Sequence, residues 1–81
     1  MSAMRAKMQI QKIELHSGCE VLHFVAVAKS GGYGADGLDE DNTFSKFSPS
    51  GDLRITITNV NLHGKFKVGE KYYLDFTKAE K

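Results

Sequence analysis

The most reactive side chains in this sequence are a single cysteine and three histidines. His16 and Cys19 bracket the stretch His-Ser-Gly-Cys, where a tight turn would place an imidazole beside a thiol. Such a pair could supply half of a zinc site, or a nucleophile with its base. Structural zinc requires four ligands, usually including several cysteines, and a catalytic cysteine requires a base that a third group orients. We therefore expect neither a metal site nor a catalytic residue at this turn.

The second candidate is the stretch SGGYGADGLDEDN, residues 30–42, which combines glycines with four acids. Its spacing lacks the glycine at the sixth position and the glutamate at the twelfth that a calcium-binding EF-hand loop requires. Its glycines lack the Gly-Lys-Ser/Thr order or the helix-opening Gly-x-Gly-x-x-Gly of nucleotide-binding loops. We expect a flexible, solvated loop over 30–42, with weak cation binding as the alternative. With no catalytic carboxylate pair, Ser-His-Asp set or metal motif, we predict no enzyme, no metal and no cofactor.

The candidate binding residues are aromatic and basic instead: Tyr33, Arg54, Lys65, Lys67 and Tyr73. Tyrosine rings beside cations on the face of a barrel could stack on the bases of single-stranded nucleic acid or of a nucleotide. An exposed tyrosine in a strand also commonly just covers its neighbours. The net charge of +1 argues against a dedicated duplex-DNA binder.

The length and composition are those of one small domain covering residues 1–81. Hydrophobic residues make up 41% and charged residues 26%, which is ordinary for a globular protein. A single cysteine cannot form an internal disulfide, so a reducing compartment is expected. The start MSAMRAKMQIQK has no apolar run like a signal peptide, and no stretch is long enough to cross a membrane. We expect a soluble intracellular protein with no membrane partner.

The first half of the chain predicts a long β-hairpin over residues 8–28. Apolar residues alternate along residues 8–15, but the alternation slips by one position at Gln11-Lys12. A β-bulge at the slip would return the following side chains to the core. After a tight turn, residues 20–29 are rich in valine and contain no glycine or proline, as in a second strand.

The second half of the chain predicts three more strands and one helical turn. We expect a short strand between Phe44 and Phe47, a strand over Leu53–Thr58 after a Pro-Ser-Gly turn, a helical turn capped by Asn59 and ended by Gly64, and a last strand over 71–77. Five strands with a helical turn before the last one predict an all-β, SH3-like barrel. An OB-like barrel, whose helix lies between strands three and four, is the second choice.

Three blocks of the sequence, MRAKMQIQKIE, DNTFSKFSPSGDLRITITN and FKVGEKYYLDFTKA, follow one another in this order. Together they resemble small, mostly uncharacterised proteins of tailed bacteriophages and prophages, which show an MRAKF-like start, an ENKSF…TPSG-like hairpin and a YYxDFT ending. The resemblance spans roughly residues 4–79. It departs at Val60, where those proteins commonly carry a proline, and in the 30–42 loop, which is longer here.

The resemblance implies a phage protein that works in the cytoplasm of a bacterial host, and it implies no catalytic residue. We expect a non-enzymatic accessory protein of host takeover or anti-defence, acting as a homo-oligomer. It would bind and inhibit or sequester a host component, either a host defence protein or a signalling nucleotide held between subunits. The alternatives are a single-stranded nucleic-acid-binding protein of phage DNA metabolism and a small structural or decoration protein of the virion.

Overall fold

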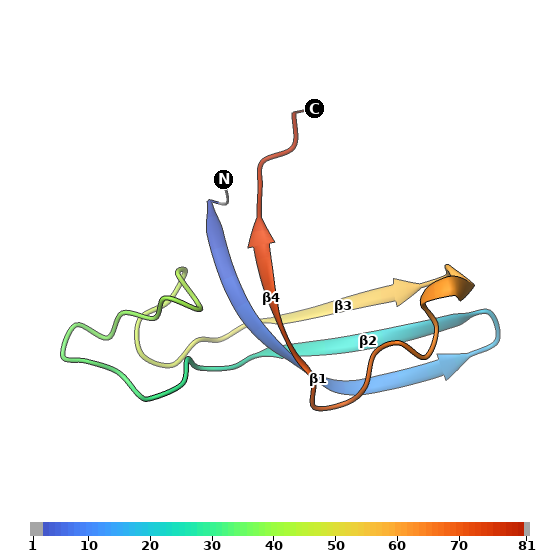
Figure 1. Ribbon diagram of the computed structural model, residues 1–81, viewed down its shortest axis with the longest axis horizontal. Helices are drawn as coiled ribbons and strands as arrows, with labels where there is room; N and C mark the ends of the chain where they lie inside the picture. Colours follow the sequence, from blue (N-terminus) through green and yellow to red (C-terminus); the bar gives the residue numbers. More distant parts are fainter. Residues whose placement is uncertain (1–2, 81) are drawn as a thin grey trace.

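A computed structural model describes residues 3–80, and this part of the chain is all-β, as the sequence predicts. Its elements are β1 (Met4–His16), β2 (Cys19–Ala26), β3 (Asp52–Ile57), the short 3₁₀ helix η1 (Val60–Leu62) and β4 (Lys71–Phe76). The strands form one antiparallel sheet in the order β3-β2-β1-β4 (Figure 1). No helix among the described residues is long and apolar enough to cross a membrane.

Strand β1 is shared between two parts of the sheet. Its N-terminal part pairs with β4 and its C-terminal part with β2, and the strand curves visibly between them (Figure 1). The register with β2 shifts between Ile10 and Lys12, so Gln11 is the extra residue of a β-bulge. The bulge predicted from the phase slip is therefore confirmed. Bulges bend a strand and increase its twist, which fits the change of partner near this point.

One face of the sheet, which we call the core face, carries the apolar side chains. Its buried residues are Ala6, Met8, Ile10, Leu22, Phe24 and Ile57. The ring of Tyr72 packs edge-on against Phe24 and Phe66, with centroid distances of 6.3 and 5.6 Å. Phe76, which the alternation of the last strand places in the core, is 48% exposed instead, because it pairs with Met4 at the outer end of the sheet.

The predicted barrel is not confirmed, in either its five-stranded SH3-like form or its OB-like form, because the sheet is open. The expected third strand around Phe44 and Phe47 does not form. Phe47 has a φ of 60°, a left-handed backbone conformation incompatible with a strand. The Ser45 N–H donates to Asn42 O in a turn, and only one isolated bridge, between Leu38 and Lys46, remains in this region. Strands β3 and β4 therefore stay at the two edges.

The shape of the molecule reflects this open sheet. The principal extents are 48 × 33 × 16 Å and the radius of gyration is 14.6 Å. A compact domain of this length would have a radius of gyration of about 12 Å. The chain is thus flatter than a closed barrel, with a loop packed across one end of the sheet and η1 at the other (Figure 1).

The predicted helical turn is confirmed as η1. The side-chain oxygen of Asn59 accepts a hydrogen bond from the Asn61 N–H at 3.0 Å, which is the expected N-cap interaction. Gly64 follows with a φ of 77°, a left-handed conformation that ends the turn and that glycine adopts without strain. The chain then crosses back to form β4 beside β1.

Candidate ligand site on the polar face

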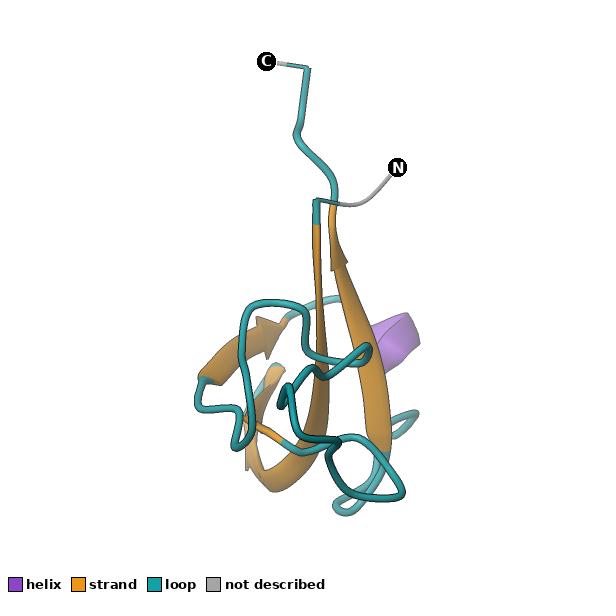
Figure 2. Ribbon diagram, turned by 90° about the vertical axis from the view of Figure 1, so that its left-hand side faces the viewer, coloured by secondary structure: helices purple, strands orange, loops and turns teal. Residues whose placement is uncertain are grey.

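The segment between β2 and β3, residues 27–51, is organised around Asn42, which is fully buried. The Asn42 Nδ2 group donates to Val27 O at 2.8 Å and to Asp39 Oδ2 at 3.2 Å. Its Oδ1 accepts from the Lys7 N–H at 2.8 Å. One side chain therefore ties the long loop to the end of β2 and to β1. In the view of Figure 2 the loop, in teal, lies in front of the strands.

The same loop closes the edge of β1 beyond the point where β2 ends. The Val27 N–H donates to Lys7 O, and the Thr43 N–H donates to Arg5 O, both at 3.0 Å. The Arg5 N–H in turn donates to Thr43 Oγ1 at 2.9 Å. The loop thus replaces a strand along this edge, and the backbone groups that β2 leaves open are satisfied.

Asp39 is the second buried centre of the loop, with 3% of its surface exposed. Its carboxylate accepts hydrogen bonds from the Tyr33 hydroxyl at 2.8 Å, from Asn42, and from the backbone N–H groups of Lys29 and Asp41. Burial raises the pKa of Asp39, but these donors outweigh burial and lower it below its usual value. The expectation of a solvated acidic cluster is therefore wrong for Asp39; the flexibility of residues 30–42 stays a prediction.

Tyr33, a predicted binding residue, is part of this internal network. Burial, together with the hydrogen bond to Asp39, raises the pKa of its hydroxyl to about 12. Its ring also packs edge-on against Phe47, at a centroid distance of 5.8 Å. Gly37 is buried beneath the Phe47 ring, and its φ of 70° requires glycine. Tyr33 therefore stabilises the loop, and its hydroxyl already has a partner within the chain.

Three cations near the loop are also paired within the chain. Lys7 Nζ lies 3.5 Å from Asp41 Oδ2, and Lys29 Nζ lies 3.2 Å from Glu40 Oε2. Arg5 is close to Asp75, with Nε 2.8 Å from Oδ1, and its guanidinium lies 4.6 Å from the centre of the Tyr73 ring. That ion pair lowers the pKa of Asp75 through a hydrogen bond and charge attraction.

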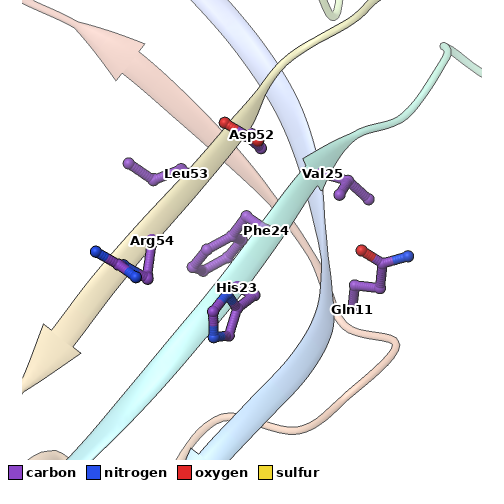
Figure 3. A pocket seen from close by; sticks show the side chains of 7 residues that line it. All are labelled: Gln11, His23, Phe24, Val25, Asp52, Leu53 and Arg54. Carbon is purple, nitrogen blue, oxygen red and sulfur yellow. The ribbon is translucent and has the colours of Figure 1, made fainter.

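The other face of the sheet, which we call the polar face, contains a pocket where β1, β2 and β3 lie side by side (Figure 3). The pocket has a volume of about 390 Å³ and is lined by Gln11, His23, Phe24, Val25, Asp52, Leu53 and Arg54. Cross-strand pairing fixes this set, because His23 is opposite Arg54 and Val25 is opposite Asp52. The bulge on β1 adds the amide of Gln11 as the extra residue.

Two of the lining residues carry the useful chemistry. Arg54 has no ion-pair partner among residues 3–80, so its guanidinium is available to an anion. His23 Nε2 lies 2.6 Å from Glu14 Oε2, and this hydrogen bond fixes the orientation of the imidazole ring. The hydrogen bond from His23, followed by that from His16, lowers the pKa of Glu14. Glu14 therefore stays ionised and can accept a hydrogen bond from His23 Nε2.

The five predicted binding residues do not come together. Arg54 lines the pocket, Tyr33 lies in the long loop, and Tyr73 lies on β4 next to Arg5. Lys65 and Lys67 lie in the connection from η1 to β4, on either side of the core residue Phe66. No hydrogen bond or ion pair joins any two of these five within residues 3–80.

Of the residues that line the pocket, Arg54 alone is among the five binding residues predicted from the sequence. His23 is recognisable only once the register puts it opposite Arg54. The phase slip at Gln11 was the available signal, because bulges often lie next to functional sites. Among the described residues, no group of three histidine, cysteine or acidic side chains could hold a metal ion. No protein-family model, no curated protein and no solved structure matches this chain.

Proposed function

We propose that the protein is a non-enzymatic phage accessory protein that binds and sequesters a host component in the cytoplasm of the bacterial host. The component we propose is a small anionic molecule of the nucleotide class, bound in the pocket on the polar face. The resemblance of three sequence blocks to phage proteins supports the setting. The pocket around Arg54 is the single observation that supports the ligand.

The lining of the pocket suits the parts of a nucleotide. Ligand pockets usually have volumes of about 300–1,000 Å³, and 390 Å³ lies within that range. The planar guanidinium of Arg54 can donate two parallel hydrogen bonds to a phosphate. Asp52 can accept from ribose hydroxyls, while Val25 offers apolar contact to a base. A ligand of this kind would pair with the guanidinium of Arg54, which has no ion-pair partner among residues 3–80.

The chemistry of the lining favours binding over turnover. The pocket supplies a guanidinium, an amide and a carboxylate, but no hydroxyl or thiol nucleophile. The imidazole of His23 is held by Glu14 rather than by a nucleophile that it could activate. A protein of this kind would act by occupancy, removing its ligand from solution.

The test is native mass spectrometry of the tagged protein, purified gently from infected host cells. We expect an extra mass of nucleotide size on the wild-type protein and its loss in Arg54→Ala. Lys65→Ala is the matched control, because it removes a cation outside the pocket and should keep the extra mass. A bare wild-type chain, or retention of the extra mass by Arg54→Ala, would contradict the proposal.

A second candidate is binding of single-stranded nucleic acid across the same face. The observation that favours it is the extent of the polar face, where Lys12 lies beside the pocket and Lys71 and Tyr73 continue it onto β4. Phosphate contacts would make binding strongly dependent on salt. Titration with oligothymidine at several salt concentrations tests this second function. The absence of binding at low salt excludes it. Binding that requires several linked nucleotides favours it over a mononucleotide ligand.

A further inference from the structure

The outer edge of β3 has no partner within the described chain. The Ala26 N–H donates to Gly51 O, which fixes the phase of the antiparallel pairing between β2 and β3. In such a ladder, alternate residues direct their N–H and C=O groups to opposite sides. The backbone groups of Asp52, Arg54 and Thr56 therefore point away from β2, toward the open edge.

This edge is less protected than the edge of β1. Proteins usually blunt a free edge with proline, a bulge, charged side chains (lysine above all) or a covering loop. Asn42 and Thr43 cover the edge of β1, whereas β3 pairs without irregularity along its length and contains neither proline nor lysine. On the core face of β3, Leu53 is only partly buried and Ile55 is 41% exposed.

The charges on β3 match a second copy of the same strand. Asp52 and Arg54 lie two residues apart on the polar face, and neither has an ion-pair partner among residues 3–80. In an antiparallel pair of β3 strands with the two-fold axis at Leu53, each Asp52 faces Arg54 of the partner subunit. Opposite charges that face each other across two strands stabilise the pairing.

The other central register is less favourable. With the two-fold axis at Ile55, Arg54 would face Thr56 and Asp52 would face Thr58 of the partner subunit. Neither charge would then face its opposite, so this register lacks the stabilising charge pairs. The axis at Leu53 also puts Gly51 opposite Ile55 of the partner subunit, where the small residue leaves room for the larger one. Pairing in this register uses the outward-pointing backbone groups of Asp52 and Arg54.

We propose that two copies of this chain associate through β3, with the two-fold axis at Leu53, to form one continuous sheet. Association gives hydrogen-bond partners to the outward-pointing backbone groups of β3 and covers the side chains of Leu53 and Ile55. It also changes the ligand site, because Asp52, Leu53 and Arg54 line the pocket. In the dimer each Arg54 faces Asp52 of the partner subunit, and its five N–H groups allow the guanidinium to donate to that carboxylate and to a bound phosphate at once. The dimer rests on the geometry of β3 and not on the proposed ligand.

A charge-swap series, followed by sedimentation equilibrium of the ligand-free protein, tests the dimer. We expect a dimer for the wild type and a monomer for both Asp52→Arg and Arg54→Asp. The double variant Asp52→Arg/Arg54→Asp should be a dimer again, since each pair is restored with its charges reversed. A monomeric wild type at millimolar concentration, or single variants as dimeric as the wild type, overturns the proposal. Circular dichroism confirms that each variant keeps its sheet.

Disulfide cross-linking tests the register in a Cys19→Ser background. Leu53→Cys should form an intersubunit disulfide on mild oxidation, because the axis at Leu53 brings the two side chains face to face. Ile55→Cys should not. Efficient cross-linking of Ile55→Cys alone overturns the register. A monomer that still loses its ligand on Arg54→Ala overturns the dimer but leaves the proposed function standing, so the two can fail separately.

Discussion

The two ends of the sheet treat their polar groups in opposite ways. Around the long loop, Asn42 and Asp39 are buried with several hydrogen-bond partners each, and Lys7 is paired with Asp41. Along β3, Asp52 and Arg54 have no ion-pair partner in the described chain, and the strand's outer edge is open. The buried polar groups of the first end find their partners within the protein, and the charges of the second end are left to solvent or to a binding partner.

The difference shows where function is to be sought. The long loop is rich in glycine and acids and has the composition of a binding loop, yet its side chains are used to hold the fold together. The polar face of β2 and β3 has the unremarkable alternation of an ordinary sheet, yet it carries the available cation, the pocket and the open edge. Polar residues without partners, rather than unusual composition, mark the candidate site.

The largest expected effect is the loss of stability in Asn42→Ala. The substitution removes the partners of Lys7 N–H and Val27 O inside the protein, which should lower the free energy of unfolding by about 2–4 kcal/mol. The matched control is Asn61→Ala on the exposed η1, where the side chain has no such role and the change should stay within about 0.5 kcal/mol. Urea unfolding measures both; equal effects would contradict the distinction between the two ends.

The next effect separates two glycines of the same loop. A Cβ at Gly37 would overlap the Phe47 ring, whereas one at Gly31 meets nothing within 4 Å, and both residues have positive φ. Gly31→Ala should therefore lower the free energy of unfolding by about 1 kcal/mol, because alanine is strained in the left-handed conformation. Gly37→Ala adds the steric overlap with the Phe47 ring, so it should lower the free energy of unfolding by about 2–3 kcal/mol in total. Thermal unfolding of the two variants measures the gap, and the absence of a gap would show that Phe47 moves aside freely.

A smaller effect is expected from acid on the loop alone. The pKa of Asp39 is lower in the folded protein than in the unfolded chain, so its stabilising contribution is complete above its ordinary pKa of about 4 and is lost as the pH falls through the folded pKa. Amide hydrogen exchange at Asn42 should accelerate in acid before exchange in β2 does. Asp39→Asn should abolish this pH dependence and Asp36→Asn should preserve it; simultaneous loosening of loop and sheet would speak against an independent loop.

The smallest expected change is the stability of Arg54→Ala. Because Arg54 has no ion pair in the described chain, the free energy of unfolding of the Arg54→Ala protein should stay within about 0.5 kcal/mol of the wild-type value. Chemical denaturation of the ligand-free protein, at a concentration low enough to keep it monomeric, measures this. A loss of 2 kcal/mol or more would mean that the residue has a structural role instead of an available charge.

The sequence predicts those parts of the fold that depend on neighbouring residues. The bulge at Gln11, the strand after Gly51 and the cap at Asn59 all follow from local alternation or turn chemistry and are confirmed. The role of Asn42 cannot be predicted in this way, because its partners Lys7 and Val27 are 35 and 15 residues away in the chain. The closed barrel was wrongly expected because Phe47 fits a strand in composition but adopts a left-handed φ.

The same limit applies to the site. Arg54 was predicted from its exposed, basic character on a well-formed strand. His23 was not, because only the register of β2 against β3 brings it beside Arg54. Tyr33 was predicted as an exposed aromatic, but its hydroxyl is engaged by Asp39, whose burial cannot be read from an acidic run. Residue type predicts which side chains can bind, and long-range pairing decides which of them are available.

The most direct test of the central claim is a two-dimensional ¹H–¹⁵N NMR titration of the labelled protein. The titrant is the nucleotide fraction extracted from infected host cells, so the ligand need not be known beforehand. We expect shifts centred on Gln11, His23 and Arg54, with the signals of residues 27–51 unchanged and with no shifts in the Arg54→Ala protein. Shifts centred on the long loop, or an unchanged spectrum of the wild type, would contradict the assignment of binding to the polar face.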